Sequence, residues 1–228
     1  MAEERLCVIF DVDGVLVDSY AAHFNSWRAL ADTSGCHKMT EDEFRQTFGR
    51  TSREIIAEPW FEPTLTAAEI RELDAKKEEL FREQLRSDFR AMPGAATLIE
   101  SLVSSDFSIA AGSSGPPDNV YLVLDQLGGR DRFSAVITGV DVTRGKPDPE
   151  VFLLCAQQLG APPARCAVIE DAVVGIEAAN QAGMLSIALV PDGNATTSFN
   201  EADHVTQRLP DLSPMLIRRW IQERRGSG

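Results

Sequence analysis

The stretch LCVIFDVDG, residues 6–14, decides the fold, because five apolar residues run directly into two aspartates and a glycine. An unbroken apolar run followed by a turn signal is typical of a strand that is buried on both faces of a parallel sheet. Asp11 and Asp13 are two residues apart, so in an extended backbone their carboxylates point to the same side. Gly14 permits a sharp turn after them. The stretch therefore predicts a buried strand with two carboxylates at its carboxyl end.

Further apolar runs and helical patterns alternate along the rest of the chain. We expect strands over residues 107–112, 134–138, 166–170 and 185–190, and helices over residues 95–104, 119–127, 149–159 and 172–182. This alternation predicts an α/β fold with a doubly wound, Rossmann-like parallel sheet in the strand order 3-2-1-4-5.

A long helical segment separates the first strand from the second. Helix formers with apolar spacing occupy residues 21–31, 41–48, 52–57 and 66–89, and Thr66 to Glu69 matches a capping box. We expect a catalytic core of residues 1–16 and 92–228 and an inserted α-helical cap of residues 17–91. An insertion at this point is well placed to form a lid over the strand ends.

The composition narrows the class of protein. The chain has 228 residues, of which 43% are hydrophobic, and a net charge of −13 that argues against a nucleic-acid partner. No apolar run approaches the roughly 18 residues of a membrane span, and the charged start, residues 1–5, predicts no signal peptide. We therefore expect a cytoplasmic protein with no membrane partner. The four cysteines form no CxxC pair and are expected to be reduced.

Polar residues gather where the predicted strands end. The carboxyl ends of parallel strands share one edge of a sheet, and ligands bind at that edge. Lys146 lies in a loop, between Gly145 and Pro147. The other candidates close predicted strands: Asp11, Asp13, Ser113, Glu170 and Asp171. Two carboxylate pairs, a hydroxyl and a lysine at one edge suggest Mg²⁺-assisted phosphoryl transfer through an aspartyl intermediate.

Each motif also has a plainer interpretation when it is taken alone. The first aspartates could form an acidic turn or a calcium loop, although the EF-hand spacing is not met. Asp171 could be a helix N-cap, and Ser113 could belong to an ordinary turn. Residues 139–146 narrowly miss a Walker loop, with five residues between the glycines and Pro147 in place of Ser or Thr, so we reject nucleoside triphosphate binding.

A charge count links the motifs to the cap. Asp11, Glu170 and Asp171 bring three negative charges and a phosphomonoester about two, while Mg²⁺ and Lys146 return three positive charges. About two negative charges remain for backbone N–H groups and cap cations. Arg53 is the cap cation that we expect to contribute.

With these motifs in this order, the chain resembles the haloacid dehalogenase superfamily, in the helical-cap branch that includes β-phosphoglucomutase and sugar phosphatases. The resemblance covers nearly the whole chain. It implies that Asp11 is the nucleophile, that Asp13 is the general acid and base, and that Ser113 and Lys146 bind the phosphoryl group. It also implies a Mg²⁺ ion held by Asp11, the backbone carbonyl of Asp13, Glu170 and Asp171. Dehalogenases proper lack the second aspartate, so Asp13 argues for phosphate chemistry.

The resemblance extends into the cap. His23 and Arg53 match residues that serve domain closure and the substrate's distal end in the β-phosphoglucomutase-like group, although His23 could equally be a packed cap histidine. Lys76 or Lys77 could be the group's cap lysine. Ser114 is a further candidate substrate contact. The mutase pattern has a Lys-Asn pair after the second motif, whereas this chain has Asp118-Asn119 and lacks that cation.

We therefore expect a Mg²⁺-dependent phosphatase of small phosphorylated sugars or related metabolites. A β-phosphoglucomutase is the alternative, and a non-catalytic binding module is a remote one. The sequence leaves the natural substrate and the oligomeric state open.

Overall fold

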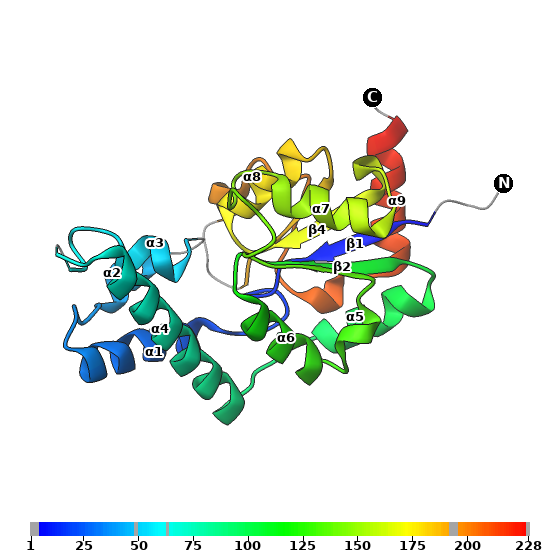
Figure 1. Cartoon of the computed structure of the whole chain (residues 1–228). Coiled ribbons are helices and arrows are strands. Elements are labelled where there is room, and N and C mark those ends of the chain that lie inside the picture. Colours follow the sequence, from blue (N-terminus) through cyan, green and yellow to red (C-terminus); the bar gives the residue numbers. More distant parts are fainter. Residues whose placement is uncertain (1–4, 48–49, 63, 192–195, 227–228) are drawn as a thin grey trace. The chain divides into compact units, whose positions relative to one another are not determined.

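The chain divides into two compact units. The computed structural model describes residues 5–47, 50–62, 64–191 and 196–226. One unit, here called the core, comprises residues Met1–Val17 and Ala91–Gly228, and the other, here called the cap unit, comprises Asp18–Arg90. Figure 1 shows strands in the core and helices alone in the described part of the cap unit. The charged start, residues 1–4, lies outside the described residues.

The core is built on a parallel sheet, which confirms the predicted fold class. Its strands follow the order β3-β2-β1-β4-β5-β6 and pair in parallel throughout. They are β1 (Cys7–Phe10), β2 (Ser108–Gly112), β3 (Ala135–Ile137), β4 (Cys166–Glu170), β5 (Leu185–Leu189) and β6 (His204–Thr206).

The sixth strand extends the predicted order 3-2-1-4-5. It has three residues, and two of them are exposed or half-buried. An edge strand this short leaves no apolar run in the sequence, which is why it was not predicted.

Helices cover both faces of the sheet. α7 and α8 lie over one face and α5 over the other (Figure 1). Ile9 and Val168 from the strands pack with Phe152 of α7 in a core from which solvent is excluded. The helices of the core are α5 (Ala95–Ser104), α6 (Pro117–Gln126), α7 (Glu150–Leu159), α8 (Val173–Gln181) and α9 (Pro214–Gly226).

The cap unit is helical and has its own apolar core, which includes Trp27, Leu30 and Ile56. Its helices are α1 (Tyr20–Ser34), α2 (Glu41–Arg45), α3 (Ser52–Ile56) and α4 (Ala67–Ser87). The predicted capping box at Thr66 is confirmed, and α2 and α3 begin with two more. The predicted end of the second helix at Phe48 lies outside the described residues.

All four cysteines are free thiols, and Cys36 alone among them is not fully buried. Within the described ranges, no helix has the length and apolar character needed to cross a bilayer.

Candidate active site

The first strand ends in a tight turn that places Asp11 at the sheet edge. The Asp11 N–H donates to the Ile169 carbonyl of β4 at 3.0 Å, so the ladder continues one residue beyond β1. Gly14 has φ +75°, a region that L side chains rarely adopt. A Cβ there would also lie 1.9 Å from Oδ2 of Asp171. The glycine therefore allows both the turn and the close approach of the Asp171 carboxylate.

Glu170 ends β4 with its carboxylate held on two sides. The Ala172 N–H donates to its Oε2 at 2.7 Å. A Cβ on Gly175 of α8 would lie 1.9 Å from its Oε1, so only a glycine leaves room for the carboxylate in this position. The N-cap of α8 is Ala172, so Asp171 does not cap this helix.

Lys146 reaches from the loop between β3 and α7 into the same cluster. Its Nζ donates to Oδ1 of Asp11 at 2.5 Å and to Oε1 of Glu170 at 2.6 Å, and it lies 4.8 Å from the centre of the Phe152 ring. Its side chain is only 5% exposed. Lys146, which is 135 positions from Asp11 in the sequence, is thus held beside it in the fold.

The carboxylates in this cluster suit a divalent cation. One oxygen from each of Asp11, Glu170 and Asp171 lies within 4.8 Å of the others. Three carboxylates against one ammonium leave two negative charges, which a divalent ion would balance. Because every available donor is a hard oxygen, the set matches Mg²⁺ better than a softer metal.

Burial and mutual repulsion perturb these groups. Burial raises the pKa of Asp11 to about 7, with Glu170 and Asp13 adding to the effect and Lys146 opposing it. Burial, together with Glu170 and Asp11, also raises the pKa of Asp171 well above its usual range. Burial lowers the pKa of Lys146, but its two carboxylate partners outweigh this and raise it, so the ammonium stays charged. The site holds more negative charge than one lysine compensates.

Ser113 and Asp13 lie beside the same backbone segment. The Ser113 Oγ accepts from the Gly115 N–H at 3.0 Å, and its side chain is buried. A Cβ on Gly115 would lie 3.2 Å from that oxygen and 3.9 Å from Oδ2 of Asp13. Both side chains therefore lie near Gly115, at the start of the segment after β2. The Ser114 carbonyl packs against Gly139, where a Cβ would approach it to 2.3 Å.

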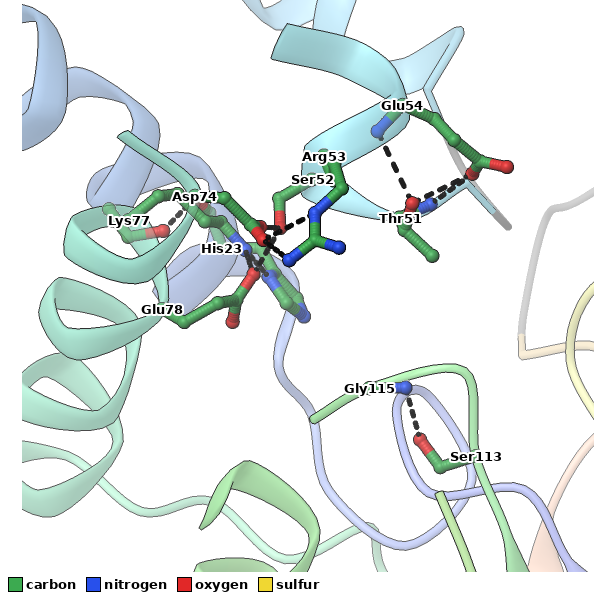
Figure 2. A network of polar contacts seen from close by, with 11 residues as sticks. His23, Thr51, Ser52, Arg53, Glu54, Asp74, Lys77, Glu78, Ser113 and Gly115 are labelled. Atoms are coloured by element: carbon green, nitrogen blue, oxygen red, sulfur yellow. Dashed lines mark hydrogen bonds and ion pairs between the residues drawn. The ribbon is translucent and has the colours of Figure 1, made fainter. Parts of the chain in front are cut away.

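The predicted cap residues form a separate network within the cap unit (Figure 2). The His23 Nδ1 lies 3.0 Å from the Lys77 Nζ, and its ring stacks on Phe81 at 3.9 Å. Arg53 Nε donates to Oδ2 of Asp74 at 3.2 Å. Of the two candidate lysines, Lys77 is the one that joins His23.

Sequence reasoning missed Gly175 and the cap acids Asp74 and Glu78. An isolated glycine inside a helical pattern was the available signal for the first, since such a glycine often has a packing reason. The two acids carry no comparable signal, because charged residues on a long helix usually lie on its solvated face.

The chain belongs to the haloacid dehalogenase-like hydrolase family, whose model matches residues 6–183. It is 31% identical over 230 residues to the β-phosphoglucomutase of Bacillus subtilis, covering 95% of this chain and 96% of the relative. It is 32% identical over 186 residues to a phosphorylated carbohydrates phosphatase of Thermotoga maritima, covering 78% and 81%. The crystal structure of a β-phosphoglucomutase from Clostridium difficile superposes with a TM-score of 0.84 at 25% identity, covering 96% of this chain and 98% of that one. The protein is therefore an enzyme whose relatives include phosphatases and phosphoglucomutases.

Proposed function

We propose that this enzyme is a Mg²⁺-dependent phosphatase of small phosphorylated sugars or related metabolites. One observation carries the proposal. Lys146 bridges Asp11 and Glu170 in a buried cluster that also contains Asp171, at the carboxyl ends of β1 and β4. This arrangement pairs a candidate nucleophile with a fixed cation and a cation-binding carboxylate set, as phosphoryl transfer requires.

The proposed reaction proceeds in two steps. An Asp11 carboxylate oxygen attacks phosphorus, the bond from phosphorus to the sugar oxygen breaks, and Asp13 gives that oxygen a proton. Asp13 then takes a proton from water, which attacks phosphorus and releases inorganic phosphate and free Asp11. Lys146 and Ser113 hold the phosphoryl oxygens in both steps. We assign substrate contacts outside the reacting group to Ser114, His23 and Arg53.

The metal site is part of the proposal. Asp11, Glu170 and Asp171 would hold the Mg²⁺, with the backbone carbonyl of Asp13 as a further ligand. The bound ion would supply positive charge next to the transferring phosphoryl group.

β-Phosphoglucomutase is the second candidate, supported by the 31% identity to the Bacillus enzyme. The two activities differ in whether water or a second sugar hydroxyl takes the phosphoryl group from Asp11. Residues 114–119, which follow the second motif, contain Asp118 and no lysine or arginine. A second phosphate would find no cationic side chain in this segment, and this favours water as the acceptor.

Phosphate release from a panel of sugar phosphates with Mg²⁺ tests the proposal. The same samples are assayed for interconversion of β-glucose 1-phosphate and glucose 6-phosphate. We expect phosphate release to exceed interconversion, and Asp11→Asn to lower turnover by at least about a thousandfold without unfolding the protein. Interconversion faster than release would establish the mutase instead. A folded Asp11→Asn variant that keeps substantial activity, with deamidation excluded, would refute the aspartyl intermediate.

A further inference from the structure

The two cations at the centre of the cap network are each paired with an acid of the same unit. Lys77 Nζ lies 2.9 Å from Oε1 of Glu78, and the Arg53 guanidinium lies 3.2 Å from Oδ2 of Asp74. Both acids come from α4, four residues apart, so they lie on one face of that helix. Figure 2 shows the two pairs meeting around Ser52.

Ser52 links the two acids, Asp74 and Glu78, through its hydroxyl group. Its Oγ lies 2.5 Å from Oδ1 of Asp74 and 2.6 Å from Oε1 of Glu78. A hydroxyl has one hydrogen, so Ser52 donates to one carboxylate at a time. The positions of the two carboxylates are therefore linked, and each keeps a cation as its neighbour.

The two cations differ in how far solvent or a ligand can reach them. The Lys77 side chain is 3% exposed, and its ammonium also lies 5.4 Å from the Trp27 ring and 5.2 Å from the Phe81 ring. The Arg53 side chain is 61% exposed, whereas that of Asp74 is 17% exposed. Arg53 can thus offer N–H donors to a ligand while the less exposed Asp74 carboxylate balances its charge.

The cap unit as a whole carries more acidic than basic residues. Residues 18–90 contain fifteen Asp or Glu and eleven Lys or Arg. A second phosphate group brings about two negative charges, and its binding requires cations that are not already compensated. Sugar hydroxyls need hydrogen-bond partners and no net charge. The Arg53–Asp74 and Lys77–Glu78 pairs supply the second kind of environment.

We infer that Asp74 sets the substrate selectivity of this enzyme, because by neutralising the exposed Arg53 it favours monophosphates with uncharged distal groups over sugar bisphosphates. The inference rests on the proposed function, in which the cap unit contacts the distal end of the substrate. Asp74 acts through Arg53 and is a positioning residue, since it fixes both the orientation and the effective charge of the guanidinium.

The test measures binding, so that it does not depend on turnover. In an Asp11→Asn background, calorimetry gives the affinities for glucose 6-phosphate and for glucose 1,6-bisphosphate. Asp74→Asn keeps the size of the side chain and removes its charge. We expect it to raise the affinity for the bisphosphate relative to the monophosphate roughly tenfold, as one uncompensated cation near a dianion would. We expect the gain to shrink as salt is added.

A second cap variant separates this local effect from net charge. Glu41→Gln removes one negative charge from the Arg45–Glu41 ion pair, which lies outside the Ser52 network. We expect it to leave the affinity ratio unchanged. Glu78→Gln is the less informative variant, because it leaves the buried Lys77 ammonium without its carboxylate partner and so destabilises the folded protein.

Three results would overturn the inference: an unchanged ratio in folded Asp74→Asn, an equal rise in Glu41→Gln, or no binding of either sugar phosphate to the folded protein. Mutase activity in the turnover assay would overturn the proposed phosphatase function, while the binding ratio would still decide the role of Asp74.

Discussion

Gly175→Ala tests whether the position of the Glu170 carboxylate controls catalysis. The new Cβ would lie 1.9 Å from Oε1, 2.0 Å from Cδ and 2.6 Å from Cγ of Glu170, whereas ordinary contacts begin at 3.4 Å. The carboxylate must therefore move by roughly 1.5 Å. Glu170 is 1% exposed and accepts from Lys146 at 2.6 Å and from the Ala172 N–H at 2.7 Å. The move breaks at least one of these bonds.

The expected effects on activity and on stability differ in size. A displacement of about 1 Å at a reacting site costs about a hundredfold in rate, so we expect kcat/KM to fall by that factor or more. Alanine is favoured over glycine inside a helix by about 1 kcal/mol, whereas overpacking costs about 1–3 kcal/mol. The net loss of stability is then at most about 2 kcal/mol, or roughly 4–8 °C in Tm for a chain of this size.

The matched control is Gly145→Ala, next to Lys146. A Cβ there meets nothing within 4 Å, and the backbone has no positive φ. Phosphate release from the best substrate of the panel gives kcat/KM for both variants, and circular dichroism with thermal unfolding checks the fold. Wild-type activity in Gly175→Ala would refute a fixed catalytic role for Glu170. An equal loss in Gly145→Ala would assign the effect to general disturbance of the site.

Two further predictions concern stability. Folding raises the pKa of Asp11 from 3.8 to about 7. Between pH 3.8 and about pH 7 the folded protein therefore keeps a proton that the unfolded chain has released. The stability of the metal-free protein consequently falls as the pH rises through this range. We therefore expect Mg²⁺ to raise Tm more at pH 8 than at pH 5, relative to chelated protein, and an equal shift at both values would contradict a metal site at Asp11. Thr66→Ala removes the capping box of α4 and should cost about 1 kcal/mol, or about 2–4 °C in Tm, with Thr33→Ala as a helix-surface control.

The sequence was sufficient for the parts of the fold that local pattern determines. Buried parallel strands must be largely apolar on both faces, so β1, β2, β4 and β5 stand out as nearly continuous apolar runs. The carboxyl ends of such strands share an edge, so the proximity of Asp11 to Glu170 and Asp171 could be predicted from their positions alone.

The rest depended on contacts that no local pattern records. The path of the loop that carries Lys146 decides which carboxylates its ammonium reaches, and the ammonium also contacts the Phe152 ring and the Gly112 carbonyl, which belong to other elements. The pairing of Lys77 with Glu78, adjacent in sequence and both buried, runs against the usual exposure of charged helix residues. In the folded unit Ser52 donates to Glu78, and Lys77 lies between the Trp27 and Phe81 rings.

The topology separates the carboxylate cluster of the core from the cap unit along the chain. The sheet order places β1 between β2 and β4, so three motifs distant in sequence become neighbours. The insertion leaves and returns through one narrow connection, where Val17 bridges Ala91 and the Met92 N–H donates to the Leu16 carbonyl at 3.0 Å. An insertion whose ends pair with each other adds little constraint to the sheet that carries it. Under the proposed function, changes in cap residues such as Asp74 would therefore alter which substrates bind without moving Asp11 or Lys146.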